Sequence, residues 1–268
     1  QNEKRDMEWD SPWGKGFPGW HLECSAMAMD KLGETIDIHT GGIDHIPVHH
    51  TNEIAQSEAA TGKPFANYWL HNNFLMVDGT KVSKSIGNTY EIKDLESKGF
   101  SPEDFRLFVL QSHYQSESNF TWENMQGAKN RLQSYRAMAV MRFQPQITQD
   151  GVDFESAYQA ILEALQDDMN TPVALQILSD VDNRVKENGI ASAQAESFTT
   201  FLQNIDALLG LSLSAEQDIT EVQRKLIQSR DTARGAKNWK ESDTLRDELE
   251  KQGLIIRDTP IGQIWSRI

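Results

Sequence analysis

The pattern of apolar and polar positions changes in character along the chain. In the first 123 residues, stretches with helical spacing alternate with short β-like runs, and glycine or proline separates them. "HLECSAMAMDKLG" has a helical pattern that ends at Gly33, "TIDIHT" follows as a strand, and "GGIDHIPVHHTNEIAQSEAATG" predicts a helix from Pro47 to Gly62. "YWLHNNFLMV" predicts more strand, and Ser101 and Pro102 start another helix. This alternation predicts a layered α/β unit.

From about Asn124 onward, apolar residues recur mainly at helical spacing. The segments "NMQGAKNRLQSYRAMAVMRF", "FESAYQAILEALQDDMN", "TPVALQILSDVDNRVKENG" and "SAQAESFTTFLQNIDALLG" predict an antiparallel helix bundle. After the polar link "LSLSAEQD", two helical stretches and two β-like runs around a Thr-Pro turn predict a small α+β module. We therefore expect an α/β part over residues 1–123, a bundle over 124–212 and the small module over 213–268.

Composition narrows the class of protein. With 38% hydrophobic and 25% charged residues, the chain has the composition of a soluble globular protein, and no apolar run approaches the roughly 20 residues of a membrane-spanning helix. One cysteine excludes an internal disulfide framework and fits a reducing, cytoplasmic compartment. The formal charge of −14 disfavours diffuse binding to nucleic acid, so such a partner must meet a local basic patch.

Cys24, His49 and Glu53 offer a thiolate, an imidazole and a carboxylate, all of which bind zinc. His49 and Glu53 are four residues apart, so a helix that begins at Pro47 places both on one face. The spacing is not that of a zinc finger, and His50 has the same chemistry as His49. The alternative is a structural, buried cysteine beside a surface histidine pair. The residues alone leave both interpretations open.

Three further side chains near this trio suggest a pocket. Asp44 lies in the glycine turn "GGID" before a helix, where it either faces a cationic ligand group or serves the turn alone. Trp20 and His21 precede the helix of Cys24, where they line either a pocket or the edge of a core.

The loop "KVSKS", residues 81–85, follows a strand and a "DGT" turn. Two lysines on a mobile, Gly-flanked loop suit a polyphosphate, because charge must be neutralised as a phosphoanhydride bond breaks. A solvated loop is the alternative. Ser83 and Ser85 lack an obvious His/Asp arrangement, which disfavours a serine nucleophile.

The C-terminal region contains a basic segment within an otherwise acidic chain. Six basic residues stand against a single acidic one, Asp231, and Trp239 lies among them. Phosphate contacts plus base stacking on an aromatic ring are how proteins hold unstacked bases, and a charged helix face with one core tryptophan is the alternative. The six are Arg224, Lys225, Arg230, Arg234, Lys237 and Lys240.

Five motifs occur together and in order: "GWHLECSAM", "DIHTGGID", "HHTNEIAQSE", "YWLHNNFLMVDGTKVSKSIGN" and "DDMNTP". In this combination the chain closely resembles the cysteinyl-tRNA synthetases, which are class I aminoacyl-tRNA synthetases. The likeness covers essentially the whole chain. It implies a partial Rossmann-like catalytic domain, then a helical bundle and an anticodon-binding module.

The resemblance also implies a ligand set and an amino-acid pocket. Zinc is implied to bind Cys24, His49 and Glu53, while Trp20, His21 and Asp44 line the pocket for L-cysteine. Shape alone distinguishes cysteine from serine by only roughly 1–3 kcal/mol. Zinc supplies the remaining discrimination, because it binds the substrate sulfur as a thiolate.

The implied reaction joins cysteine to ATP and then to tRNA-Cys. The cysteine carboxylate attacks the α-phosphorus of ATP, supplied with Mg²⁺, to give cysteinyl adenylate and pyrophosphate, and the 3′ end of the tRNA then accepts the cysteine. Lys84, with Lys81 and Ser83 in support, corresponds to the ATP-binding loop of the family and is implied to stabilise the phosphate charge. The residues implied to read the anticodon are Arg234, Trp239, Asp243 and Asp258.

The sequence departs from the family pattern in three ways. Val82 replaces the usual methionine of the lysine loop, and "IPVHH" replaces "FPHH", which leaves the choice between His49 and His50 open. The "HIGH"-type motif and the family's N-terminal zinc-binding cysteine do not occur. Since the chain begins with Gln1, we expect it to be the C-terminal part of a monomeric synthetase and inactive in ATP–pyrophosphate exchange alone.

Two alternatives remain. A mycothiol-type ligase joins cysteine to an amino-sugar with the same catalytic core, but it lacks a full tRNA-binding tail, so the basic module after Glu221 argues against it. The other alternative is a non-catalytic fragment that binds tRNA.

Overall fold

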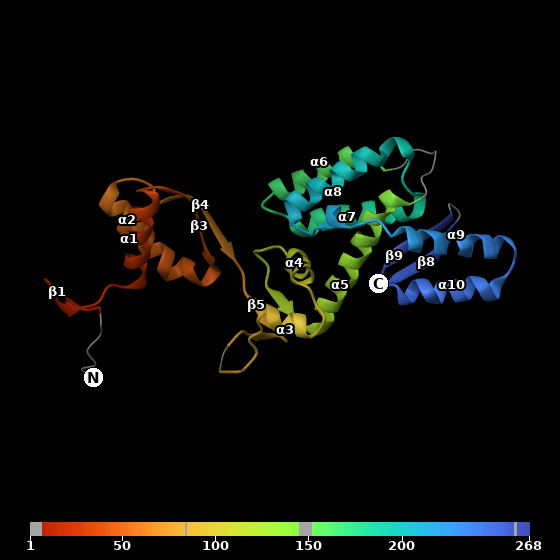
Figure 1. The fold of residues 1–268 in the computed structure, drawn as a ribbon. Coiled ribbons are helices and arrows are strands. Elements are labelled where there is room, and N and C mark those ends of the chain that lie inside the picture. The colour runs from red at the N-terminus through yellow and green to blue at the C-terminus, as the bar shows by residue number, and fades with distance from the viewer. Residues whose placement is uncertain (1–6, 84, 145–151, 260–261) are drawn as a thin grey trace. The chain divides into compact units, whose positions relative to one another are not determined.

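A computed structural model describes residues 7–83, 85–144, 152–259 and 262–268 of the chain (Figure 1). Contacts divide the chain into two compact units. The first comprises residues 1–81 with 114–119, and the second comprises residues 82–113 with 120–268. Among the described residues, no helix is both long and apolar enough to cross a membrane.

The first unit has α/β structure, but the helix that starts after Ser101, which the alternating pattern places in the same part, belongs to the second unit. Strands β3 and β4 are parallel, with Ile38 opposite Tyr68 and Gly41 opposite His71, and helix α2 connects them as a β-α-β crossover. Helix α1 packs against α2. The bounds are β1 Trp9–Ser11, β2 Gly14–Gly16, α1 Trp20–Leu32, β3 Ile36–Gly42, α2 Thr51–Thr61, β4 Ala66–Asn72, β5 Leu75–Val77, β6 Thr80–Lys81 and β7 Ser118–Phe120.

Helices of the first unit end where the sequence predicts, but α2 begins later. Gly33 and Gly62, with φ of 97° and 68°, accept the backbone conformation that terminates α1 and α2. A helical segment does begin near Pro47, as predicted, but its first turn is not α-helical. A 3₁₀ turn over Ile43–His45 and a π-helical turn over Ile46–His50 precede Thr51. Pro47 has no N–H, and the Thr51 hydroxyl donates to the Ile46 carbonyl at 2.6 Å, which stabilises the wider turn.

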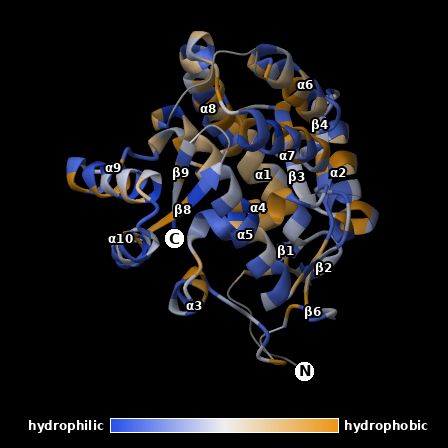
Figure 2. Cartoon of the chain, turned by 90° about the vertical axis from the view of Figure 1, so that its right-hand side faces the viewer, coloured by the Kyte–Doolittle hydropathy of each residue, from blue (hydrophilic) through white to orange (hydrophobic). Residues whose placement is uncertain are grey.

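The second unit contains the predicted helical bundle and the small α+β module. Buried side chains from the bundle helices form one core, which includes Leu132, Leu178 and Phe198. Two helices and a hairpin follow, and the residues of the helices α9 and α10 are largely hydrophilic (Figure 2). The bounds are α3 Ile92–Ser97, α4 Pro102–Leu110, α5 Trp122–Ala139, α6 Phe154–Gln166, α7 Thr171–Asn188, α8 Ala195–Leu209, α9 Glu221–Gly235, α10 Trp239–Lys251, β8 Leu254–Thr259 and β9 Gly262–Arg267.

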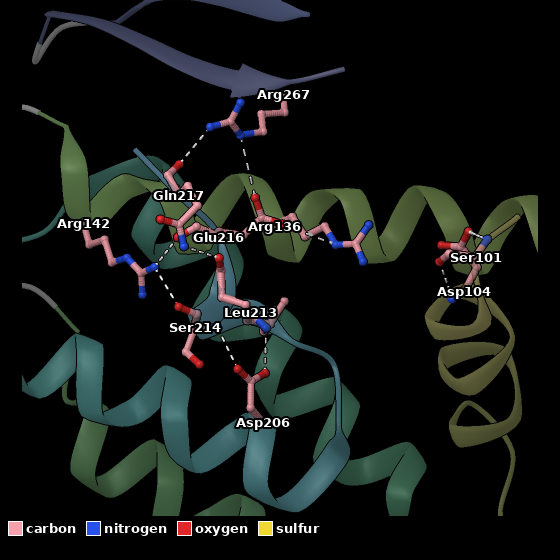
Figure 3. Close-up of polar contacts among 11 residues, drawn as sticks. Ser101, Asp104, Arg136, Arg142, Asp206, Leu213, Ser214, Glu216, Gln217 and Arg267 are labelled. Atoms are coloured by element: carbon pink, nitrogen blue, oxygen red, sulfur yellow. Dashed lines mark hydrogen bonds and ion pairs between the residues drawn. The ribbon is translucent and has the colours of Figure 1, made fainter. Parts of the chain in front are cut away.

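The segment between α8 and α9 is fixed by polar contacts (Figure 3). Both carboxylate oxygens of Asp206 accept backbone N–H groups, one from Leu213 and one from Ser214, at 2.7 Å each. The Arg142 guanidinium donates to the carbonyl oxygens of Ser214 at 2.9 Å and Glu216 at 2.5 Å. The backbone that leads from the bundle to the module is therefore held through its N–H groups by Asp206 and through its carbonyl groups by Arg142.

Two more arginines approach the same segment from α5 and β9. The Glu216 carboxylate lies 3.5 Å from Arg136 Nε and 3.9 Å from Arg267 Nε. Arg267 also donates to the carbonyl oxygen of Gln217 at 3.0 Å (Figure 3). It donates to the carbonyl oxygen of Asp218 at 3.1 Å as well. Bundle, connecting segment and hairpin thus share one polar network.

Gln144 closes the junction by pairing with the backbone of Trp265 in β9. Its Nε2 donates to the Trp265 carbonyl at 2.6 Å, and its Oε1 accepts from the Trp265 N–H at 2.8 Å. Both residues are buried. Ile264, the neighbour of Trp265, reaches the core of the bundle.

We expect Gln144→Ala to lower the free energy of unfolding by about 1–3 kcal/mol, because it leaves a buried N–H and carbonyl without partners. Denaturant unfolding measures the change. Gln176→Ala is the matched control, since Gln176 is exposed and bonds only across one helical turn to Asp180. Equal stability of the two variants would contradict the role assigned to Gln144.

Candidate functional site

Cys24, His49 and Glu53 come together in the first unit. Cys24 lies on α1, His49 in the π-helical turn and Glu53 in the first turn of α2. One ligand atom from each residue lies within 4.8 Å of the others. The three residues that the sequence nominates therefore form one donor cluster.

The cluster has the chemistry and spacing of a zinc site. Glu53 is completely buried, and its Oε1 has no hydrogen-bond partner among the described residues. His49 Nε2 lies 3.7 Å from this oxygen, which is too long for a hydrogen bond. Tetrahedral zinc with ligand distances of about 2.0–2.1 Å separates two such atoms by about 3.3 Å. A buried carboxylate oxygen facing an imidazole and a thiol fits this metal.

A second trio, His39, His50 and Glu53, shares the carboxylate. His39 Nε2 lies 2.7 Å from Glu53 Oε2, and His50 Nε2 lies 3.9 Å from the same oxygen. His50 is also bonded through Nδ1 to Nε2 of His71 at 2.7 Å. Since Oε2 is engaged and Oε1 is open toward His49, the geometry favours His49 over His50 beside Cys24.

Burial shifts the pKa values of two side chains in this region, His50 and Cys24. It lowers the pKa of His50 to about 4, and the neighbouring His39, His71, His45 and His49 act in the same direction. Burial also raises the pKa of the Cys24 thiol, with smaller contributions from Glu53 and Glu23. A bound metal ion is therefore needed to hold the Cys24 sulfur as a thiolate at neutral pH.

We expect the metal-free chain to lose about 1–3 kcal/mol of stability as the pH falls from about 6.5 to 4. In this window the unfolded state, whose histidine has its ordinary pKa, binds more protons than the folded state, so stability rises with pH. Denaturant unfolding across this range measures it. His50→Gln should flatten the profile, and a profile as steep as that of the wild type in this variant would refute the assignment.

The glycine pair before the π-helical turn permits close approach of the histidines. A Cβ at Gly41 would come within 2.6 Å of the His50 ring and 2.7 Å of the His45 ring. A Cβ at Gly42 would come within 2.4 Å of Asp44 Oδ1. Packing against the His50 and His45 rings thus explains the glycine at position 41.

Of the predicted cysteine-pocket residues, His21 has a described contact with one of the donors, His49. Its ring is 6.4 Å from the His49 ring, in an edge-on arrangement. Trp20 is 77% exposed at the start of α1, and Asp44 is also exposed. No described contact joins Trp20 or Asp44 to the donor cluster, so their roles stay predictions.

The lysine loop follows a tight hairpin. Asp78 and Gly79 have φ of 49° and 71°, as a two-residue turn between β5 and β6 requires. The Lys81 ammonium lies 4.7 Å from the Phe74 ring centre. The Ser83 N–H donates to Asn88 Oδ1 at 2.8 Å, which ties the start of the loop to a residue that follows it. The predicted ATP ligand Lys84 falls outside the described residues.

In the C-terminal basic segment, Arg234 lies close to both Trp239 and Asp258. Trp239 is 55% exposed at the start of α10, and the Arg234 guanidinium lies 5.6 Å from its ring centre. Arg234 Nη1 is 3.2 Å from the Asp258 carboxylate, while Asp243 is exposed on α10. Hydrogen bonding from Arg230 is the main cause that lowers the pKa of Asp258.

Three family models match the chain in order. Residues 1–130 match the tRNA synthetases class I (C) catalytic domain, residues 160–214 the DALR domain, and residues 216–265 the cysteinyl-tRNA ligase anticodon binding domain. The cysteine–tRNA ligase of Chlamydia muridarum is 41% identical to this chain over 100% of its length and 60% of the relative's. The chain belongs to the cysteinyl-tRNA synthetase family.

Other members of the cysteinyl-tRNA synthetase family show similar agreement. The cysteine–tRNA ligase of Legionella pneumophila strain Corby is 45% identical over 98% of this chain and 58% of its own length. That of Treponema denticola is 40% identical, covering 99% and 59%. The chain therefore spans about 60% of the length of these curated relatives.

A solved structure supports the class I fold of this family member. The ternary complex of Agrobacterium radiobacter K84 agnB2 LeuRS-tRNA-LeuAMS aligns with a TM-score of 0.57 at 14% identity, over 79% of this chain and 34% of the LeuRS chain. At this identity the likeness concerns the fold alone. It confirms the predicted fold class.

Proposed function

We propose that this chain supplies the cysteine-selecting metal pocket, the ATP-binding lysine loop and the tRNA-binding module of a cysteine–tRNA ligase. The observation that carries the proposal is the open, buried Glu53 Oε1, which faces His49 and Cys24 in a chain of this family. A cytoplasmic location and a monomeric state belong to the same proposal.

In the amino-acid pocket, Cys24, His49 and Glu53 would hold a zinc ion. When bound, zinc supplies an electrophilic site that accepts the substrate sulfur as a thiolate and has little affinity for a serine hydroxyl. His39 donates to Glu53 Oε2 and thereby keeps Oε1 turned toward the donors. Trp20, His21 and Asp44 are proposed to line the cysteine site.

Lys84, Lys81 and Ser83 are proposed to bind ATP, which enters with Mg²⁺. The cysteine carboxylate attacks the α-phosphorus, pyrophosphate leaves, and the cysteinyl group then passes to the 3′ end of tRNA-Cys. Lysine ammonium groups stabilise the charge that develops on the phosphates. Arg234, Trp239, Asp243 and Asp258 are proposed to hold the anticodon.

The match of residues 216–265 to an anticodon-binding domain supports tRNA as the partner. It gives no support to the amino-sugar ligase alternative. A filter-binding comparison of tRNA-Cys with a tRNA of another anticodon, in a salt series, tests this partner.

Cobalt substitution tests the metal pocket directly. We expect the Co²⁺-loaded chain to show a thiolate-to-cobalt absorption band that intensifies when L-cysteine is added and not when L-serine is added. The reason is that a second thiolate joins Cys24 on the metal. Cys24→Ser should remove the band of the substrate-free chain. Equal responses to cysteine and serine would defeat the proposed selection.

A further inference from the structure

Arg230 is the largest fully buried side chain in the described part of the molecule. It lies on α9, and its exposure is 0%, so it cannot touch an RNA ligand. A buried guanidinium persists only where acceptors compensate its lost hydration. Its acceptors therefore indicate what it does.

The acceptors of Arg230 come from both strands of the C-terminal hairpin. Nη1 donates to Asp258 Oδ1 at 2.8 Å and to Gln263 Oε1 at 2.5 Å, and Nη2 donates to Asp258 Oδ2 at 3.0 Å. Asp258 and Gln263 are directly opposite each other in the β8–β9 register. Gln263 also donates to Asp231 Oδ1 at 2.8 Å, which returns the network to α9.

Asp258 links the buried Arg230 to arginines at the surface. The oxygen that accepts from Arg230 Nη2 also lies 3.2 Å from Arg234 Nη1 and 3.8 Å from Arg246 Nη2. Arg234 is partly exposed, and its guanidinium lies against the exposed Trp239 ring. Both carboxylate oxygens of Asp258 are thus engaged by arginine in the absence of RNA.

We infer that Arg230 is a positioning residue for RNA binding, which acts through Asp258 to hold Arg234 against Trp239. This inference rests on the proposed tRNA-binding function of the module. An arginine side chain that is already fixed loses less rotamer freedom when a base stacks on the adjacent ring. Asp258 accordingly serves first to orient Arg234, and contact with a base is secondary.

The test uses the full chain with tRNA-Cys and Arg230→Lys, which keeps the charge and loses the planar two-nitrogen pairing. We expect roughly tenfold weaker binding. Arg257→Lys is the matched control, because Arg257 precedes Asp258 and points to the opposite face of β8. In the Arg234→Ala background, Arg230→Lys should cost no further affinity; an undiminished penalty there, or wild-type binding by the single variant, overturns the inference.

A second readout does not depend on RNA. In chain labelled with 5-fluorotryptophan, the Trp239 fluorine resonance is assigned by its loss in Trp239→Phe. Arg230→Lys should shift or broaden that resonance, and Arg257→Lys should leave it in place. An unmoved Trp239 resonance refutes the positioning role, whereas failure of the wild-type chain to prefer tRNA-Cys refutes the proposed function instead.

If Arg230→Lys fails to fold, Gln263→Ala replaces it in both measurements. This variant removes the amide that accepts from Nη1 and donates to Asp231, and it leaves the two contacts of Arg230 with Asp258. We expect the same direction of change in binding and in the Trp239 resonance, with a smaller amplitude. The inference would be overturned if the folded Gln263→Ala variant showed wild-type tRNA binding, an unmoved Trp239 resonance and no coupling to Arg234→Ala.

Discussion

Glu53→Gln is expected to weaken zinc binding by roughly a thousandfold or more, since loss of an outer partner alone typically costs 10–100-fold. The variant is isosteric, so the packing of α2 is preserved while the charged ligand is lost. Competition with a chromophoric chelator measures the affinity.

The same variant should leave the metal-free chain as stable as the wild type or more stable. In the wild type a fully buried carboxylate has one oxygen without a hydrogen bond to any residue that the structure describes, and neutralising it removes a desolvation cost. Glu34→Gln is the control, because Glu34 is exposed and pairs with Lys63 at the surface. If Glu53→Gln bound zinc as strongly as the wild type, Glu53 would not be a zinc ligand, and the metal would be held by other residues.

Asp258→Ala is expected to lower the free energy of unfolding of the second unit by about 1–3 kcal/mol. It leaves the buried Arg230 guanidinium without its carboxylate, and the cost is moderate because the Asp258 side chain is itself 32% exposed and the Gln263 amide oxygen still accepts from Arg230. Thermal or denaturant unfolding gives the value.

Asp243→Ala provides the comparison within the same group of proposed anticodon residues. Asp243 is exposed on α10, so its removal should change stability by less than about 0.5 kcal/mol. The family resemblance assigns Asp243 and Asp258 the same role, but the two substitutions should differ in their effect on the free energy of unfolding. Equal unfolding free energies for the two variants would contradict the buried network.

Local signals in the sequence were sufficient for much of the fold. Glycine at positions 33 and 62 ends α1 and α2 because each adopts a positive φ that other residues avoid, and Ser101 caps α4 through its side chain. The π-helical turn over Ile46–His50 could not be predicted in this way. It depends on a hydroxyl contact from Thr51 and on packing of histidines from other elements.

The candidate site was accessible from sequence only where its members share a helix or a motif. His49 and Glu53 are close in sequence, and the family motifs include Cys24. His39 and His71 were missed because they lie on β3 and β4, and only the parallel pairing of these strands brings them to the cluster. Arg230 was recognised only as one of six basic residues, since charge alone does not reveal burial.

The junction at Gln144 has a consequence for how the second unit opens. Because Ile264 belongs to the bundle core and Trp265 is paired with Gln144, amide protons in β9 should exchange through the same cooperative opening as those of α7. Cutting the chain before Leu213 would remove Ile264 from the bundle core and free the Trp265 backbone. The anticodon module thus folds and unfolds together with the bundle as one cooperative unit. It is not an independently folding domain.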